Sequence, residues 1–263
     1  MPWVDSVHAL AHAWYLGNAT GSAIADVLFG KHNPSGRLPI TFPRREEDVP
    51  AFGHFHSENG KINYAEDLFV VRTHSPRRLN CNLTILLCRV INTTCTEKSR
   101  LSFHSGTCRL PFLRLVRKPD MLLSPSYSFG LSYTTFSLSH FQISEPIVSD
   151  DAFTLTASVR VTNTGNVAGS EVVQLYVSLP PTSGLTHPPL QLKAFAKVYD
   201  LQPGQSQDVN MELDKYAVSY WAEEVEGWIV EQGEYGLRAG TSSANLEVQA
   251  GFTIAKGFEW RGI

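Results

Sequence analysis

Carboxylate side chains between residues 46 and 67 are the groups of this sequence best placed for acid–base chemistry. Hydrolysis by a carboxyl pair needs two groups about 5–10 Å apart, one protonated and one ionised. Sequence spacing does not set that distance, and a solvated loop after Arg44 and Arg45 is the simpler interpretation of the acidic run. We therefore assign no catalytic residue here. The carboxylates are Glu46, Glu47, Asp48, Glu58, Glu66 and Asp67.

Histidine and cysteine spacing predicts neither a metal site nor a cofactor. His54 and His56 would share one face of a strand, but no third ligand accompanies them, so surface histidines are the simpler interpretation. The cysteines lack the Cys-x₂-Cys pairs of a zinc site, and they form either two disulfides, with three possible pairings, or incidental thiols. P-loop and Rossmann glycine patterns are also missing. The cysteines are Cys81, Cys88, Cys95 and Cys108.

Five aromatic residues near the C-terminus are a second candidate binding surface. Exposed aromatic rings bind sugar rings by covering their C–H surfaces. Packing inside a small β-domain explains the same residues with fewer assumptions, so we expect core and edge packing and assign no substrate-binding residue from the sequence. The aromatic residues are Tyr220, Trp221, Trp228, Tyr235 and Trp260.

Charge is divided unevenly along the 263 residues. The formal net charge is −3, from 22 Lys and Arg against 25 Asp and Glu. Residues 71–128 hold ten of the basic and two of the acidic side chains, together with all four cysteines. A pI near 6.3 argues against a general nucleic-acid-binding protein. No apolar run approaches the roughly 18 residues that a membrane-spanning helix needs, so we expect no membrane insertion.

Residues 1–70 have the pattern of part of an α/β domain. A hydroxyl side chain can cap the start of a helix, and glycine suits the position after its end. Helix, turn and strand in succession fit one crossover of an α/β sheet. The expected elements are a buried strand or a short helix at 7–15, a helix capped by Thr20 or Ser22 and ended by Gly30, a turn at 33–36 and a strand at 37–42.

Residues 140–263 alternate apolar and polar side chains, which predicts half-buried antiparallel strands. About seven short strands in this length are typical of an immunoglobulin-like sandwich. The fold class expected for the chain is therefore an α/β fragment followed by an all-β sandwich, with residues 129–139 as a linker. The expected strands are 153–162, 173–179, 192–198, 209–213, 228–230, 235–239 and 246–254.

Ordered motifs in these two regions resemble the fungal β-glucosidases of glycoside hydrolase family 3. Gly21–Gly30 and Asn33–Pro43 resemble the second domain of that family, and Asn63–Val70 resembles a later motif of the same domain. Phe129–Phe136 resembles the phrase that leads into the family's fibronectin type III-like domain. That last domain is matched by Val161–Gly169, Leu201–Gln205 and Gly233–Tyr235.

The resemblance implies a retaining enzyme that releases terminal β-D-glucose from cellobiose and short cello-oligosaccharides. Family members carry a nucleophilic Asp on an N-terminal barrel and an acid/base Glu upstream of the segment that matches residues 1–30. We therefore carry over no catalytic residue, and we expect this chain to be inactive unless a barrel assembles with it in trans. The alternative is a non-catalytic fibronectin type III-like binding or scaffold module.

The resemblance also implies secretion, although Met1–Asp5 contain neither a basic nor an apolar signal region. Sequons at Asn18, Asn82 and Asn92 are glycosylation candidates if the chain enters the secretory pathway. The family connects Val70 to Phe129 by about 20 residues, whereas this chain uses 58 of foreign composition. Residues 71–128 are therefore expected to be an atypical insert without a stable fold, such as translated non-coding sequence; a genuine lineage-specific loop is the alternative.

Overall fold

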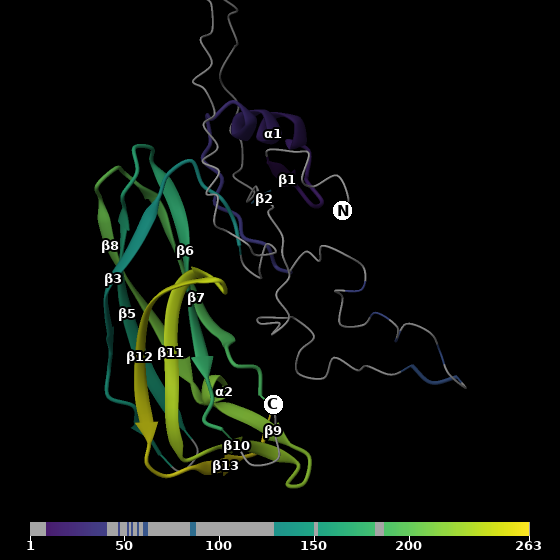
Figure 1. Cartoon of the computed structure of the whole chain (residues 1–263), viewed down its shortest axis with the longest axis vertical. Coiled ribbons are helices and arrows are strands. Elements are labelled where there is room, and N and C mark those ends of the chain that lie inside the picture. Colours follow the sequence, from purple (N-terminus) through teal and green to yellow (C-terminus); the bar gives the residue numbers. More distant parts are fainter. Residues whose placement is uncertain are drawn as a thin grey trace, which may run out of the picture.

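A β-sandwich dominates the molecule, and a short α/β segment lies against one end of it (Figure 1). The computed structural model describes residues 9–40, 129–149, 152–181 and 187–262, together with residues 47, 52, 54, 57, 60–62 and 85–87. Within these ranges no helix is long and apolar enough to cross a membrane. The predicted order, an α/β fragment before an all-β domain, is confirmed.

One strand and one helix make up the N-terminal segment. Strand β1 (Leu10–His12) pairs in parallel with β2 (Ile85–Leu87), so the strand alternative holds within residues 7–15. Helix α1 (Thr20–Leu28) follows, with Val27 as its buried residue. Gly30 has φ of +74°, the left-handed conformation that favours glycine just beyond a helix end. The predicted end of this helix is therefore confirmed.

The predicted cap of α1 is wrong. Ala19 is the N-cap residue, and no side chain accepts a hydrogen bond from the first turn. The hydroxyls of Thr20 and Ser22 instead donate to backbone carbonyls three residues earlier, at Gly17 (2.5 Å) and Ala19 (3.0 Å). Hydroxyl side chains compete in this way for nearby backbone groups, which sequence alone does not resolve.

The strand predicted at 37–42 is also wrong over its described part. Residues 37–40 belong to no strand, since residues 39 and 40 form a bend, and Leu38 N donates to Phe129 O (2.9 Å). Pro39 has no N–H to donate, which weakens pairing at this point. The side chain of Leu38 is fully buried instead. Residues 41 and 42 lie outside the described residues.

Two four-stranded sheets form the body of the sandwich. In one, β5 is central, with β3 and β4 along one side and β8 along the other; in the second the order is β12-β11-β6-β7. All these pairs are antiparallel. The bounds are β3 (Phe136–Ile143), β4 (Ile147–Val148), β5 (Phe153–Asn163), β6 (Gly169–Ser178), β7 (Gln191–Leu201), β8 (Ser206–Asp214), β11 (Gly233–Ser242) and β12 (Asn245–Ile254).

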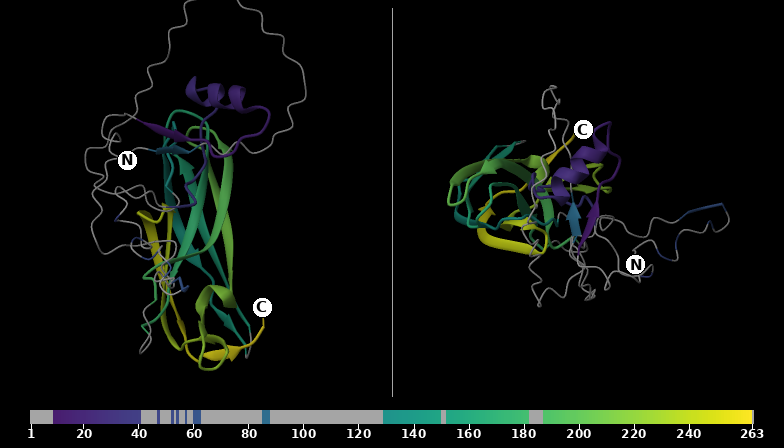
Figure 2. Two further views of the ribbon diagram at one scale, coloured as in Figure 1. Left: turned by 90° about the vertical axis from the view of Figure 1, so that its right-hand side faces the viewer. Right: turned by 90° about the horizontal axis from the view of Figure 1, so that it is seen from above.

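A small third sheet lies at the end of the sandwich opposite α1 (Figure 2). Its order is β13-β10-β9, and the short helix α2 leads into it. The C-terminus lies at this end, whereas α1 and β1 lie at the other (Figures 1 and 2). The bounds are α2 (Lys215–Val218), β9 (Ser219–Ala222), β10 (Gly227–Val230) and β13 (Phe258–Trp260).

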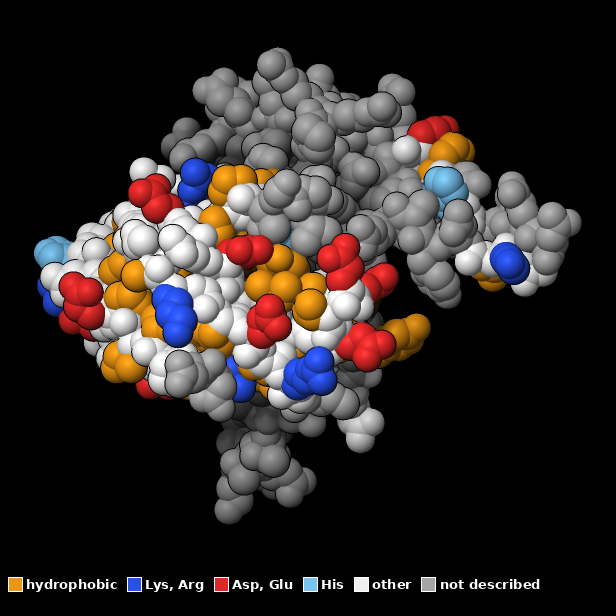
Figure 3. Space-filling view, turned by 90° about the horizontal axis from the view of Figure 1, so that it is seen from below, with side chains coloured by type: hydrophobic (Ala, Val, Ile, Leu, Met, Phe, Trp, Pro, Cys, Tyr) orange, Lys and Arg blue, Asp and Glu red, His pale blue; other side chains and the backbone are white. Residues whose placement is uncertain are grey.

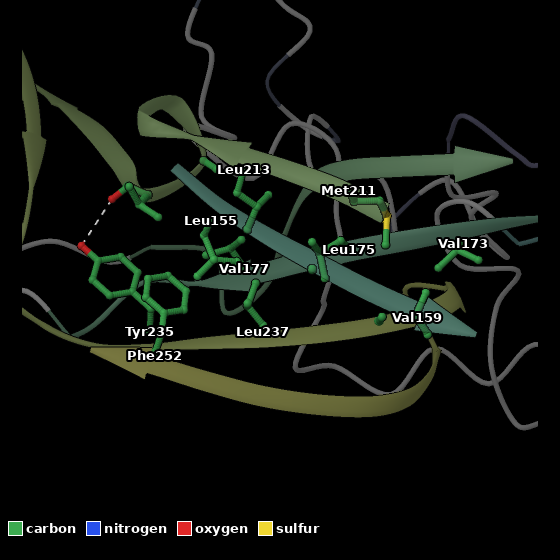
Figure 4. Packing of buried hydrophobic residues seen from close by; sticks show 14 of the residues in the cluster. Leu155, Val159, Val173, Leu175, Val177, Met211, Leu213, Tyr235, Leu237 and Phe252 are labelled. Carbon is green, nitrogen blue, oxygen red and sulfur yellow. Dashed lines mark hydrogen bonds between the residues drawn. The ribbon is translucent and has the colours of Figure 1, made fainter. Parts of the chain in front are cut away.

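Strict alternation along β5 builds the core. Phe153, Leu155, Ala157, Val159 and Val161 are all at most 2% exposed, while the residues between them face outward. They meet the inward side chains of the second sheet, as Figure 4 shows for Leu155, Val177 and Leu237. Burial of this apolar surface is the main source of stability for the sandwich.

All seven predicted strands are present, but the sandwich begins earlier than predicted. Strand β3 starts at Phe136, so residues 136–139 of the predicted linker belong to the first strand. A register shift between Ser139 and Gln142 and a positive φ at His140 (51°) interrupt its period-two pattern, which hid the strand. Of the predicted insert 71–128, residues 85–87 are described, as β2; its other residues lie outside the described residues.

Candidate functional sites at the two ends of the sandwich

The side chain of Asn33 joins three segments of the chain at the upper end of the sandwich. Its Oδ1 accepts hydrogen bonds from Tyr133 N (2.8 Å) and Ser132 Oγ (2.9 Å), and its Nδ2 donates to Ala168 O (3.0 Å). Asn33 belongs to the predicted turn 33–36, which presents this amide toward the sandwich. The turn therefore anchors the α/β segment to the start of β6.

Two further hydrogen bonds hold α1 and β7 to the same junction. Tyr133 Oη donates to the carbonyl of Val27 near the end of α1 (2.7 Å). Lys197 Nζ, on β7, donates to Ser35 Oγ (2.8 Å). The predicted linker 129–139 is therefore a packed part of the junction, and not a free connection between two regions.

A buried ion pair between Arg37 and Glu171 completes the junction. Arg37 Nη2 contacts Glu171 Oε1, and the two side chains are 12% and 5% exposed. Arg37 Nη1 also donates to Gly130 O (2.5 Å), and Glu171 Oε1 accepts from Val172 N (2.6 Å). Burial raises the pKa of Glu171, and the Arg37 guanidinium opposes that rise. Because the carboxylate is enclosed by its own partners, this pair is suited to holding two regions together and not to acid–base catalysis.

Gly169, at the end of the fibronectin type III-like motif 161–169, lies where the turn 33–36 closely approaches the backbone before β6. A Cβ added at Gly169 would lie 2.6 Å from Asn33 Nδ2 and 2.8 Å from Thr134 Cγ2, closer than real contacts allow. The bond from Asn33 to Ala168 requires this approach. Gly169 is therefore needed by the junction, because no side chain fits between the turn and β6.

Asn163 of the same motif is a fully buried hydrogen-bonding centre. Its Nδ2 donates to Val167 O and Leu201 O, both at 2.8 Å. Its Oδ1 accepts from Thr134 Oγ1 (2.7 Å) and Gly165 N (3.1 Å). All four hydrogen-bonding positions of the amide are occupied, which makes Asn163 a structural residue that orders the turn after β5.

A row of tryptophans crosses the small sheet at the other end of the molecule. Trp228 on β10 lies directly opposite Trp260 on β13 and Trp221 on β9, so the three side chains share one face. Trp228 stacks on Trp260 with ring centroids 5.4 Å apart and an interplanar angle of 8°, while Trp221 meets Trp228 edge-on at 5.7 Å and 79°. Tyr216 of α2 packs edge-on against Trp260 at 4.7 Å, and Lys215 Nζ lies 4.3 Å from the centroid of the Trp260 ring. We call Tyr216, Trp221, Trp228 and Trp260 the aromatic row.

Exposure increases from Trp260 through Trp228 to Trp221, and Tyr216, which packs against Trp260, is also partly exposed. Trp260 is 5% exposed, Trp228 is half-buried, and Trp221 and Tyr216 are 49% and 40% exposed. Packing alone, the interpretation favoured by the sequence, accounts for the inner rings. It does not account for Trp221 and Tyr216, which present apolar surface to solvent.

The other two aromatic candidates have structural roles. Tyr235 is 2% exposed, stacks on Phe252 at 5.2 Å, and donates from its hydroxyl to Glu231 O (2.9 Å) and Val218 O (3.3 Å) (Figure 4). A tyrosine near the start of a strand that bonds backbone just upstream is the tyrosine corner of immunoglobulin-like sandwiches. Tyr220 lies on the other face of the small sheet and donates to Glu231 Oε1 (2.7 Å).

The remaining predicted candidates are mostly outside the described residues. Glu47 and His54 are exposed, and Asn18 is exposed in the turn before α1, where an oligosaccharide could be attached. Within the described residues no group of three His, Cys, Asp or Glu side chains is arranged to hold a metal. Candidates outside the described residues are Glu46, Asp48, His56, Glu58, Glu66, Asp67, Cys81, Asn82, Cys88, Asn92, Cys95 and Cys108.

Sequence reasoning missed Asn33, Arg37 and Glu171 as interacting residues. Arg37 was placed in a strand and Glu171 falls just before a predicted strand, and the two lie 134 positions apart. Glu171 did carry a signal, because it is a charged residue at an inward position of an otherwise apolar alternation, which calls for a buried partner.

The architecture that these features define is an α/β segment clamped to a fibronectin type III-like sandwich. The model of the Glycosyl hydrolase family 3 C-terminal domain matches residues 1–71, and that of the Fibronectin type III-like domain matches residues 171–243. The first match assigns residues 1–71 to the C-terminal domain of glycoside hydrolase family 3, and the second assigns residues 171–243 to a fibronectin type III-like domain that follows it.

Named relatives agree with this assignment. The chain is 34% identical over its whole length to the "Probable beta-glucosidase K" of Emericella nidulans, of which it covers 25%, and 37% identical to the "Probable beta-glucosidase I" of Aspergillus niger, of which it covers 27%. A crystal structure of a β-glucosidase from Kluyveromyces marxianus in complex with glucose superimposes on 94% of this chain with a TM-score of 0.68 and 36% identity. The chain covers 24% of that structure. It therefore spans about a quarter of the length of the relatives that it matches.

Proposed function

We propose that the chain is the C-terminal part of a retaining β-glucosidase that hydrolyses terminal β-D-glucosyl residues of cellobiose and short cello-oligosaccharides, and that it is inactive alone. The observation that carries this proposal is the ordered pair of domain matches, together with relatives of which the chain covers about a quarter. Retaining hydrolysis uses one carboxylate to attack the anomeric carbon and a second carboxyl group to protonate the leaving oxygen. The buried carboxylate at the junction, Glu171, is already held by Arg37 and fits neither role.

Hydrolysis of p-nitrophenyl β-D-glucoside by the purified chain tests the proposal. We expect no turnover above that of a buffer blank, while a full-length β-glucosidase assayed in parallel releases p-nitrophenol. Turnover that follows the chain through size-exclusion chromatography would contradict inactivity alone.

The exposed apolar side of α1 supports assembly with further protein. Ile24, Leu28 and Phe29 are 39%, 56% and 72% exposed on and just after this short helix. Surfaces of this kind are commonly covered by a partner. We propose a barrel-containing segment of a glycoside hydrolase family 3 enzyme as that partner, in trans, with the β-glucoside as substrate of the assembled protein and no nucleic acid or membrane as a partner.

Co-purification tests this assembly. A separately expressed barrel segment of the Aspergillus niger relative should be retained by the tagged chain, and Leu28→Glu with Phe29→Glu should abolish retention because two charges would be buried. Retention that the double variant leaves unchanged would show that α1 is not the contact. Product analysis of any restored activity by NMR should give β-glucose first, as retention requires.

We also propose that the chain works outside the cell, as the resemblance implies. Asn18 supports this proposal because it is exposed in a turn and carries the sequon Asn-Ala-Thr. Secretion from a fungal host with a leader added should give a glycosylated chain, and Asn18→Gln should reduce its mass by one oligosaccharide.

A non-catalytic binding module is the second candidate function. The half-exposed outer end of the aromatic row favours it, since exposed indole and phenol rings are a common means of holding carbohydrate.

A further inference from the structure

The outer end of the aromatic row is an open aromatic surface at the edge of a sheet. Among the described strands, β9 pairs only with β10, so Trp221 lies on the outermost strand of the three. Trp221 is 49% exposed, whereas Trp260, at the inner end, is almost completely buried. Tyr216 is 40% exposed and packs against Trp260 and Trp228, on the other side of Trp228 from Trp221 in the chain of ring contacts. A ligand can therefore reach the ring of Trp221 at the edge of the sheet and the ring of Tyr216 on the other side of Trp228.

These exposed rings are held in place by their neighbours. Trp228 separates Trp221 from Trp260 and contacts both, and Tyr216 meets Trp228 edge-on at 6.1 Å. A ring fixed before binding loses little conformational freedom when a ligand covers it, which favours affinity. The inner rings thus act as a support for the outer ones.

Packing is not the whole role of the row. The indole N–H of the buried Trp260 has no hydrogen-bond partner among the described residues. An unpaired buried donor destabilises a fold by about 1–3 kcal/mol. The row therefore combines a buried N–H without a partner with a half-exposed ring at its edge, neither of which adds to the stability of the fold.

Carboxylates beside the row select the ligand. The hairpin between β9 and β10 carries exposed Glu223, Glu224 and Glu226, and it begins directly after β9. Viewed from this end, hydrophobic side chains lie among acidic and basic ones (Figure 3). Carboxylates accept hydrogen bonds from hydroxyl groups, and Lys215 beside Trp260 and Arg261 against the hairpin can donate to them. Groups of both kinds suit a neutral, hydroxyl-rich molecule with apolar faces.

We propose that Trp221 and Tyr216 bind a β-linked glucan chain by stacking on its glucose rings, with the hairpin carboxylates accepting its hydroxyls. The alternating C–H faces and hydroxyl edges of such a chain match rings bordered by carboxylates. β-Glucan is chosen over other neutral polymers because the relatives are named β-glucosidases and one related structure holds glucose. This binding needs no bond cleavage, so it extends the proposed function without depending on catalysis by this chain.

Affinity electrophoresis of the full chain in native gels with and without soluble barley β-glucan tests the proposal. We expect the glucan to slow the wild-type chain, and Trp221→Ala to lose at least about 80% of that retardation. Phe195→Ala is the matched control, because Phe195 is an aromatic residue that is 70% exposed on β7, outside the row. Its retardation should equal that of the wild type.

A fold check and a second polymer make the result decisive. The thermal unfolding temperatures of Trp221→Ala and wild type should agree closely, because Trp221 is half exposed, and Trp221→Phe should recover part of the retardation. Equal retardation of wild type and Trp221→Ala, or no retardation of the wild type, would overturn the proposal. Equal retardation by dextran, an α-linked glucan, would overturn the assignment to β-glucan. Hydrolysis is assayed separately, so these outcomes do not test the proposal that the chain is the C-terminal part of a β-glucosidase.

Discussion

Two arginine–carboxylate pairs of this molecule differ in their surroundings. Arg37 and Glu171 are buried at the junction, whereas Arg160 and Asp208 form a two-point pair on the outer face of β5 and β8, with side chains 41% and 52% exposed. Exposed pairs contribute little because water screens them. A buried pair is different, since removing one partner leaves an uncompensated charge away from water.

Arg37→Ala is therefore expected to lower the free energy of unfolding by about 3–5 kcal/mol. Arg160→Ala, the exposed counterpart, should change it little. Urea unfolding followed by tryptophan fluorescence measures both variants. A loss from Arg37→Ala no larger than that from Arg160→Ala would show that Glu171 does not depend on its partner.

The loss caused by Arg37→Ala should also depend on pH. Burial raises the pKa of Glu171 above its ordinary value of 4.5, and Arg37 opposes the rise. A raised pKa means that the folded state binds the proton more tightly than the unfolded chain. The stability that this proton binding provides is complete below about pH 4.5, and it is lost as the pH rises through the pKa of Glu171 in the folded state. Without Arg37 nothing opposes the rise in the pKa of Glu171, so Arg37→Ala should lower the free energy of unfolding more at pH 7 than at pH 4. An equal loss at both pH values would contradict this account.

At the scale of elements, α1 offers two glycines that differ only in backbone conformation. A Cβ added at either Gly21, inside the helix, or Gly30, just beyond it, would meet nothing within 4 Å. Gly30 has φ of +74°, whereas Gly21 is helical. Differences in packing around an added Cβ therefore do not contribute to a comparison of alanine substitutions at the two positions.

Gly21→Ala should stabilise the chain by about 0.5–1 kcal/mol, because alanine loses less backbone freedom in a helix. Gly30→Ala should destabilise it by roughly 1–2 kcal/mol, because a Cβ disfavours the left-handed region. Thermal unfolding temperatures measure both effects. Shifts of the same sign would mean that α1 is not formed as described.

Elements with unbroken periodicity were predictable from sequence, and those depending on distant contacts were not. Strand β5 alternates without interruption and was found almost to its exact ends, while the shift within β3 hid that strand. The short strands β9 and β13 are too brief for a periodic signal, so the aromatic row that they assemble was not recognisable as a row. The junction was not predictable for another reason. The partners of Asn33 and Arg37 lie about 100 or more residues away along the sequence, where no local pattern points to them.

At the scale of the whole molecule, the junction makes the sandwich and the N-terminal segment one unit. Asn33, Ser35, Arg37 and Leu38 each bond to residues at or beyond Phe129. A variant lacking residues 1–128 should still unfold cooperatively, because the core cluster lies within residues 138–260. It should do so at a lower temperature, by about 4 °C for each kcal/mol of lost junction stability.

Differential scanning calorimetry measures this difference. Tyr133→Phe in the full chain is the matched control, because it removes the one bond to Val27 without shortening the chain, and its shift should be smaller than that of the truncation. Equal unfolding temperatures for the truncated and full chains would show that the junction adds no stability.

The separation of 134 residues between Arg37 and Glu171 has a consequence for biosynthesis. At about 5–20 residues per second, a ribosome releases Arg37 on the order of ten seconds before it releases Glu171. During that interval the turn 33–36 and the apolar Leu38 have no sandwich to bind, so the segment emerges as an unprotected nascent chain. Recovery of folded protein should therefore depend on chaperones that shield early segments, because the binding site for the turn is complete only when β6 and β7, which carry Glu171 and Lys197, have been translated.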